Sequence, residues 1–227
     1  MNNSTLTASG FLFSSTFFDN ELECVLCECV NIYNQIISKQ TCFPNNEEII
    51  RDGFLIYLKD DYYKNSHSPL DKYQFDKEVE DGQGRLDLRI LPVNPYKGDK
   101  AFYSIECKRL DSKNTLGITG LNAEYIKNGI CRYVCDYYST HYDTNVMFGF
   151  VVEKMDINGN VGKINDLFSN DYINQQGKTV NARVKKTISR YNFANGYPYS
   201  YVSTHTHISN KEIVIYHLMF DFSNNII

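Results

Sequence analysis

The sequence predicts a mixed α/β (α+β) domain in which a central mixed sheet is flanked by helices. Apolar residues recur at helical spacing in three segments, and strand-like runs with alternating or continuous apolar residues lie between and after them. Turn-forming residues separate these segments. The chain has 227 residues, of which 42% are hydrophobic, which is enough for one sizeable core. We expect a single domain over residues 1–227, without repeats or linkers.

The first expected elements are an arm and two helices. Residues 1–18 read as an irregular arm whose aromatic side chains need a surface to pack on. A stripe of apolar residues predicts a helix over 20–39. A second helix is predicted over 47–62, where Asn45 or Asn46 can act as the N-cap.

Three strands, a helix and a fourth strand are expected next. The segments are strands over 73–80, 84–90 and 102–108, a helix over 121–138 and a buried strand over 146–153. Counted with the helix that precedes them, they have the order α-β-β-β-α-β.

The last part of the chain is harder to interpret. Residues 154–198 give one expected helix, over 181–191, and the chain closes with strands over 199–207 and 212–222. We therefore expect a core over about 46–153 that carries an N-terminal helical extension, 1–45, and a C-terminal extension, 154–227.

The candidate chemistry lies on the second and third of the expected strands. In a strand with a period of two, Glu106 and Lys108 share one face, and Asp87 lies on the face opposite the apolar residues of its own strand. If the strands are neighbours, Asp87, Glu106 and Lys108 can converge. Two carboxylates this close repel each other unless a cation lies between them, and hard oxygen ligands suit Mg²⁺ or Mn²⁺. Such a site, with a lysine beside the metal, suits phosphodiester hydrolysis.

The pattern Asp87…Glu106-Cys107-Lys108 resembles that of the PD-(D/E)XK nuclease superfamily, whose fold is restriction-endonuclease-like. The resemblance implies that Asp87, Glu106 and the backbone carbonyl of Cys107 bind Mg²⁺ or Mn²⁺. It also implies that Lys108 positions the attacking water or offsets developing charge. The superfamily's initial Pro-Asp is missing, because Leu86 precedes the aspartate.

The resemblance also suggests a further carboxylate from the helix before the sheet. Glu47 or Glu48 would supply it, although acidic residues in a first helical turn also simply complement the helix dipole. Glu78 and Glu80 on the preceding strand are alternative donors.

Four basic residues are candidate nucleic-acid contacts: Arg85, Arg109, Lys127 and Arg132. Arg85 could instead brace the carboxylate two residues away, and each of the four is also explained as an ordinary solvated charge.

Two further clusters have open interpretations. Cys24, Cys27 and Cys29 suggest a zinc or iron–sulfur site, but they lie within a helical pattern that favours buried thiols. The histidines of the last two strands could bind a transition metal, face solvent or lie beside a phosphate; they are His205, His207 and His217.

Composition excludes some classes of protein. The net charge of −4 argues against a general polyanion binder, so any nucleic-acid contact would need a local basic cleft, a metal or a partner protein. The seven cysteines, the lack of a signal-peptide pattern and the lack of a membrane-length apolar run favour a reducing cytoplasm, without membrane contact. Frequent Asn, Tyr, Ile and Lys suggest an AT-rich bacterial genome.

We therefore expect a metal-dependent endonuclease that hydrolyses DNA phosphodiester bonds in bacterial restriction or anti-phage defence. DNA is favoured over RNA by the resemblance, and a homodimer or a partner protein of a defence system is expected. The alternative is a catalytically weak subunit on the same scaffold that binds nucleic acid or protein. The intact Asp, Glu and Lys favour the enzyme.

Overall fold

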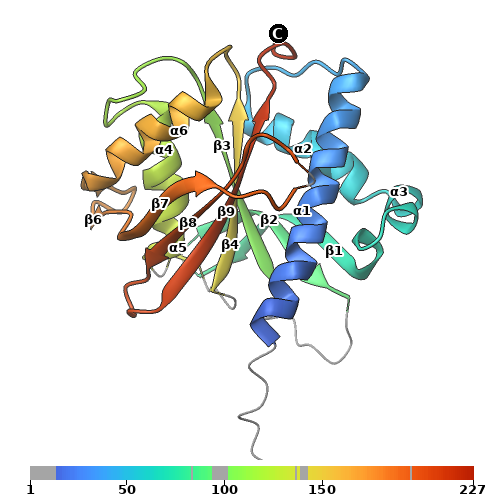
Figure 1. The fold of residues 1–227 in the computed structure, drawn as a ribbon, viewed down its shortest axis with the longest axis horizontal. Coiled ribbons are helices and arrows are strands. Elements are labelled where there is room, and N and C mark those ends of the chain that lie inside the picture. Colours follow the sequence, from blue (N-terminus) through green and yellow to red (C-terminus); the bar gives the residue numbers. More distant parts are fainter. Residues whose placement is uncertain (1–13, 83, 94–101, 136, 139–142, 195) are drawn as a thin grey trace, which may run out of the picture.

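The computed structural model describes residues 14–227 except 83, 94–101, 136, 139–142 and 195. A seven-stranded mixed sheet lies between two groups of helices (Figure 1). Its strands are β1 (Tyr73–Asp81), β2 (Gly84–Pro92), β3 (Tyr103–Leu110), β4 (Thr144–Val151), β7 (Val184–Arg190), β8 (Ser200–Thr206) and β9 (Glu212–Asp221). The predicted mixed sheet flanked by helices is confirmed.

The strands lie in the order β1-β2-β3-β4-β9-β8-β7. The first three form an antiparallel meander, and β3, β4 and β9 are parallel neighbours at the centre of the sheet. Strands β9, β8 and β7 are again antiparallel. Because parallel neighbours need a crossover connection, the chain passes from β3 to β4 through helices on one face of the sheet.

Helices α1 (Ser14–Ser38), α2 (Glu47–Leu58) and α3 (Asp61–Ser66) lie on one side of the sheet, and α4 (Leu121–Tyr125), α5 (Cys131–Val134) and α6 (Ile157–Asp166) lie on the other (Figure 1). Each side has its own buried apolar cluster. On the first side, Phe54 of α2 packs against Phe148, Phe150 and Phe220, with ring centroids 5.0–6.0 Å apart. These rings fix α2 against the sheet.

Two side-chain caps mark the beginnings of α2 and α3, and the second of them divides the helix predicted over 47–62. The Asn46 side chain accepts from the Ile49 N–H at 3.1 Å and begins α2. The Asp60 side chain accepts from the Tyr63 N–H at 2.6 Å and begins α3. Such caps satisfy N–H groups that have no partner in the first turn of a helix. The helix predicted over 121–138 is also divided, because a π-helical turn, Ile126–Ile130, separates α4 from α5.

Two predictions about the chain's ends and extensions are wrong. Within the segment 181–191, Val184–Arg190 form an edge strand, β7, and not a helix. The strand pairs with β8, and Ile188 is its one buried residue. The arm is helical from Ser14, whereas residues 1–13 lie outside the described residues. The sequence also gave no sign of α6 or of a small hairpin, β5 (Tyr172–Ile173) and β6 (Thr179–Val180).

Candidate active site

The candidate site lies where β2 and β3 stop pairing. Their backbone register runs from Ile90 opposite Tyr103 to Leu88 opposite Ile105. At the next position the Asp87 carboxylate accepts from the Cys107 N–H at 2.8 Å. The side chain thus takes the place of a strand partner, which fixes its orientation. The apolar residues of β2 also divide here, because Leu86 packs in the cluster opposite to that of Leu88, so they do not share one face as expected.

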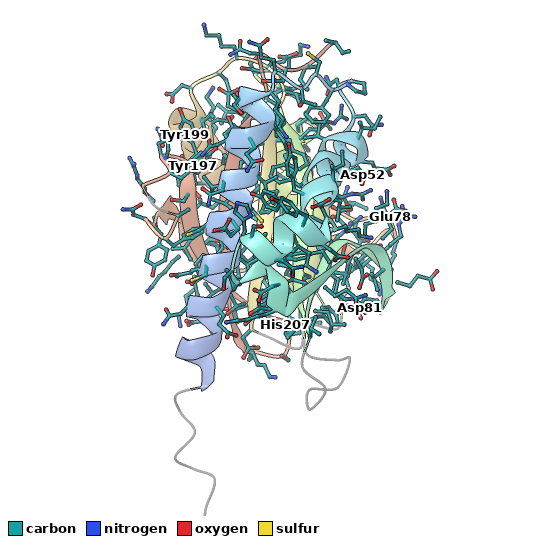
Figure 2. All side chains as sticks on the ribbon, turned by 90° about the vertical axis from the view of Figure 1, so that its right-hand side faces the viewer. Asp52, Glu78, Asp81, Tyr197, Tyr199 and His207 are labelled. Carbon is teal, nitrogen blue, oxygen red and sulfur yellow. The ribbon has the colours of Figure 1, made fainter. Side chains whose placement is uncertain are left out.

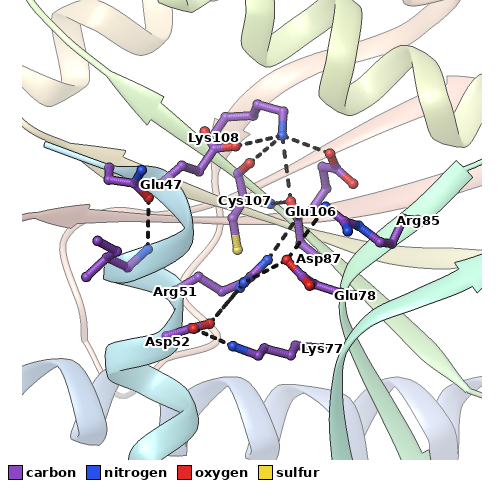
Figure 3. A network of polar contacts seen from close by, with 12 residues as sticks. Glu47, Arg51, Asp52, Lys77, Glu78, Arg85, Asp87, Glu106, Cys107 and Lys108 are labelled. Atoms are coloured by element: carbon purple, nitrogen blue, oxygen red, sulfur yellow. Dashed lines mark hydrogen bonds and ion pairs between the residues drawn. The ribbon is translucent and has the colours of Figure 1, made fainter.

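The three predicted catalytic residues come together around one nitrogen atom (Figure 3). The Lys108 Nζ lies 2.5 Å from the Cys107 carbonyl oxygen, 2.8 Å from Glu106 Oε1 and 3.6 Å from Asp87 Oδ2. It lies 3.2 Å from Glu47 Oε1. The predicted metal-ligand oxygens therefore all contact one cationic group.

Glu106 is fully buried, and both of its carboxylate oxygens are engaged. Oε1 accepts from Lys108 and, at 2.6 Å, from Arg132, and Oε2 accepts from the Tyr138 hydroxyl at 2.6 Å. Burial raises the pKa of Glu106 to about 7, and the positive charges of Lys108 and Arg132 oppose the rise. Burial and the charge of Glu106 raise the pKa of Tyr138, which keeps the phenol a donor.

Lys108 is held as a cation. Burial lowers its pKa, but the negative charges of Glu106, Asp87 and Glu47 together outweigh burial, so that the pKa lies above its ordinary value. The side chain is 11% exposed. A buried ammonium with three carboxylate neighbours is stabilised by the charges that it separates.

Helix α2 contributes two more side chains, Glu47 and Arg51. Glu47 Oε2 accepts from the Arg109 N–H at 2.8 Å, in addition to its contact with Lys108, whereas Glu48 is exposed. Of the two glutamates left open by the sequence, Glu47 therefore lies in the site. Arg51 is buried, and its Nη1 lies 3.8 Å from Asp87 Oδ1.

Glu78 stands across from Asp87 on β1 and adopts a φ of 54° inside a strand. A non-glycine residue at positive φ is uncommon and stores backbone strain. Its carboxylate lies 3.4 Å from Arg51 Nη2 and 3.6 Å from Arg85 Nη2. Figure 2 shows Glu78 and Asp52 on the same side of the molecule, and both contact Arg51. The other alternative donor, Glu80, is exposed.

The four candidate nucleic-acid contacts separate into different roles. Arg85 is 57% exposed, and Arg109 Nη1 donates to the backbone and side chain of Asn45. Lys127 forms an ion pair with a glutamate one helical turn before it. Arg132 instead points into the site and binds Glu106.

Sequence reasoning missed Arg51, Tyr138 and the inward direction of Arg132. Arg51 follows Glu47 by four residues, which places both on one face of α2; this spacing could have indicated it. Tyr138 lies beyond the end of α5, and no sequence spacing relates it to Glu106.

The oxygen atoms gathered here suit a hard divalent cation. Two carboxylates, a backbone carbonyl and a further carboxylate from α2 are ligands that Mg²⁺ and Mn²⁺ prefer. In the described part of the chain, no three or more His, Cys, Asp or Glu side chains form a cluster that could hold a metal ion as they stand. The ammonium of Lys108 lies between the oxygens, so a metal would have to displace it.

No protein-family model matches this sequence, and neither a curated protein nor a solved structure matches it. In the part of the chain that the structure describes, no helix combines the length and apolar character needed to span a bilayer.

The cysteines of α1 point in different directions. Cys24 is exposed, Cys27 is half-buried and Cys29 is buried. Cys27 donates to the Phe193 carbonyl at 3.1 Å, and burial raises the pKa of Cys29. The buried-thiol interpretation is therefore right for Cys29 and wrong for Cys24.

His205 and His217 belong to a buried chain of hydrogen bonds. His205 Nδ1 donates to the Ala182 carbonyl at 2.7 Å, so its Nε2 accepts from Ser203. Ser203 then accepts from His217 Nε2, which leaves His217 Nδ1 to accept from the Tyr125 hydroxyl at 2.8 Å. Each donor and acceptor is used once, and both imidazoles are neutral. Both side chains are buried, so the interpretation that these histidines face solvent is wrong for His205 and His217.

We expect the two buried histidines of this hydrogen-bond network to make the protein less stable in acid. Burial lowers the pKa of His205 to about 4 and that of His217 well below its ordinary value. The unfolded chain takes up protons near pH 6.5 and the folded chain does not, so stability is lost as pH falls below about 6.5. Each histidine should remove about 2 kcal/mol from the free energy of unfolding between pH 8 and pH 5. Glu106 opposes this loss, because burial raises its pKa to about 7 and the folded protein therefore takes up its proton before the unfolded chain does. The variant Glu106→Gln removes this opposing contribution.

Urea unfolding at the two pH values measures this difference. The variant His67→Gln changes a histidine outside this hydrogen-bond network, so it should show the same difference in the free energy of unfolding between pH 8 and pH 5. In the Glu106→Gln background, a free energy of unfolding that is the same at pH 8 and pH 5 would contradict the assignment of neutral, buried imidazoles.

Proposed function

We propose that this protein is a metal-dependent endonuclease that hydrolyses DNA phosphodiester bonds in bacterial restriction or anti-phage defence. The observation that carries the proposal is the convergence of Asp87, Glu106 and the Cys107 carbonyl on one cationic nitrogen. These are the oxygens that the motif assigns to a metal. A protein partner or a second copy of the chain, and a cytoplasmic location, belong to the same proposal.

The arrangement of the elements supports a restriction-endonuclease-like core. Helix α2 precedes the antiparallel meander β1-β2-β3, the helical segment α4–α5 follows it, and β4 lies parallel to β3. This is the α-β-β-β-α-β order expected from the resemblance, with α3 as an addition between α2 and β1.

The side chains divide the work of hydrolysis between them. The Cys107 N–H and Arg51 hold the two oxygens of Asp87. Arg132 and Tyr138 hold those of Glu106. Bound Mg²⁺ or Mn²⁺ would supply an activated water and offset the charge that grows on the phosphate. The ammonium of Lys108, displaced from the oxygens, is then available to contact the attacking water or the phosphate.

Cleavage of plasmid DNA and oligonucleotides in Mg²⁺ tests this function. The variant Asp87→Asn keeps the shape of the side chain but removes its charge, and we expect the cleavage rate to fall about 100-fold or more, because charge stabilisation at the reacting phosphate is lost. The control is Asp76→Asn, a half-buried β1 carboxylate that pairs with Arg89, and it should cleave normally. Equal cleavage by both variants would reject the site.

A second function, binding without cleavage, is favoured by one observation. Lys108, Arg132 and Tyr138 already satisfy Glu106 from within the protein, so the network can exist as a purely structural one. If the native protein binds DNA or a partner protein but cleaves no DNA in Mg²⁺ or Mn²⁺, alone or with that partner, the binding role replaces the enzyme.

A further inference from the structure

A cavity of about 320 Å³ opens beside the candidate site, between the helical segment 127–135 and the β5–β6 hairpin. One wall carries Lys127, Asn128 and Arg132, and the other carries Lys178 with several carboxamides. Cavities of this size hold small organic ligands. None of the elements that form its second wall belongs to the predicted core.

The described side chains that line the cavity include cations and no anion, in an acidic protein. Lys127, Arg132 and Lys178 line it, and no aspartate or glutamate is among the described lining residues, although the whole chain has a net charge of −4. Glu124 and Glu106, which pair with Lys127 and Arg132, lie outside the lining. Lysines and arginines that surround a concave surface concentrate positive potential and favour phosphate. The ligand is therefore expected to be an anion.

The other lining groups suit a nucleobase. Asn128 from the helix and Gln175 from the hairpin offer carboxamides, which can donate and accept at the edges of bases. Tyr137 adds an aromatic ring to the lining, and its centroid lies 5.0 Å from the Arg132 guanidinium. Aromatic and guanidinium planes are the surfaces on which unpaired bases stack.

The helical wall has an unusual backbone. Lys127 and Asn128 lie in the π-helical turn Ile126–Ile130, and π-helical turns are rare and occur frequently at functional sites. Gly129 packs this turn closely on the sheet, since a Cβ atom there would lie 2.4 Å from the Met147 methyl carbon. The turn therefore fixes where the two polar side chains enter the cavity.

From these features we infer that the cavity binds a nucleoside monophosphate unit. Its phosphate contacts Lys127 and Lys178, and its base lies near Tyr137 and the carboxamides. The unit is either a free nucleotide or an unpaired nucleotide of a nucleic-acid strand, which have the same chemistry. The inference goes beyond the proposed function, since binding in this cavity requires neither a metal nor cleavage. Arg132 lines the cavity and also donates to Glu106, so occupancy is coupled to the candidate site.

Calorimetric titration of the full chain in EDTA tests the inference. The probes are the four deoxynucleoside 5′-monophosphates, the matching nucleosides and inorganic phosphate. At least one monophosphate should bind, and it should bind about tenfold more tightly than its nucleoside, which lacks the charge-assisted phosphate contacts, or than phosphate alone, which lacks the contacts of the base. Lys178→Gln and Lys127→Gln should each weaken binding about tenfold. Lys154→Gln, an exposed lysine outside the cavity lining, should not.

If a single-stranded oligonucleotide competes with the bound monophosphate, and if Lys178→Gln also weakens binding of the oligonucleotide, the natural ligand is an unpaired nucleotide of a strand. Competition that is absent identifies the free nucleotide. The inference is overturned if no monophosphate binds, if phosphate alone binds equally well, or if Lys178→Gln and Lys154→Gln behave alike. Since EDTA removes divalent metals, these results do not depend on whether the protein cleaves DNA.

Discussion

Replacing Arg132 by methionine is expected to lower the free energy of unfolding by about 3–5 kcal/mol, because it leaves a fully buried carboxylate without one of its charge partners. Arg132 Nη1 lies 2.6 Å from Glu106 Oε1, and Glu106 has no exposed surface. Methionine keeps much of the packing volume of the arginine stem, so the change mainly removes charge. Chemical denaturation at pH 8 measures the loss.

Two further variants separate charge from packing. Arg85→Met changes an arginine that is 57% exposed, and it should cost less than about 0.5 kcal/mol. The double variant Arg132→Met/Glu106→Gln also removes the negative charge of Glu106. It should recover most of the lost free energy of unfolding, as expected for two residues in direct contact. A single variant Arg132→Met that is as stable as the native protein would show that Glu106 does not need this partner.

Sequence reasoning found the part of the site that depends on adjacent strands. A strand period of two, applied to neighbouring strands, brings Asp87 and Glu106 close together. Asp81 and Gly84 pair across the short hairpin turn that joins β1 to β2. Local rules also found the Asn46 cap and most of the strands, but not the Asp60 cap.

The parts that were missed depend on contacts between distant segments. Tyr138 reaches Glu106 across 32 residues and Arg51 approaches Asp87 across 36. The helical spacing in α2 relates Arg51 to Glu47, but no local period encodes the contact of Arg51 with Asp87 or that of Tyr138 with Glu106. The prediction of a helix over 181–191 was wrong for a related reason. The segment's two lysines and its alternating polar residues suit the solvent side of a helix, but they equally suit an edge strand, and pairing with β8 decides between the two.

Replacing Lys108 by methionine should produce the most informative result, because this side chain holds apart the carboxylates that are expected to bind metal. Without the ammonium, Asp87, Glu106 and Glu47 face one another around an apolar side chain. We expect the free energy of unfolding in EDTA to fall by about 3 kcal/mol or more, since the fully buried Glu106 loses a direct charge partner. Urea denaturation measures the loss.

Mg²⁺ or Mn²⁺ should reverse this loss in Lys108→Met. A cation that binds only the folded protein stabilises it by about 2.7 kcal/mol at 100 times its dissociation constant, which is similar to the expected loss. The gain should exceed that of the native protein, in which the ammonium competes for the same oxygens. Lys77→Met removes a surface lysine that pairs with Asp52, and it should show no added response to metal.

The double variant Lys108→Met/Asp87→Asn identifies where the ion binds. If the metal uses the oxygens that now contact the ammonium, loss of the Asp87 charge should abolish most of the rescue, because the site keeps fewer anionic ligands. If Mg²⁺ stabilises the double variant as much as it stabilises Lys108→Met, the ion binds elsewhere. If Lys108→Met and Lys77→Met respond equally to Mg²⁺, the buried network is a salt bridge without a metal site. A metal-dependent gain confined to Lys108→Met would mean that its ammonium occupies the position of a catalytic cation.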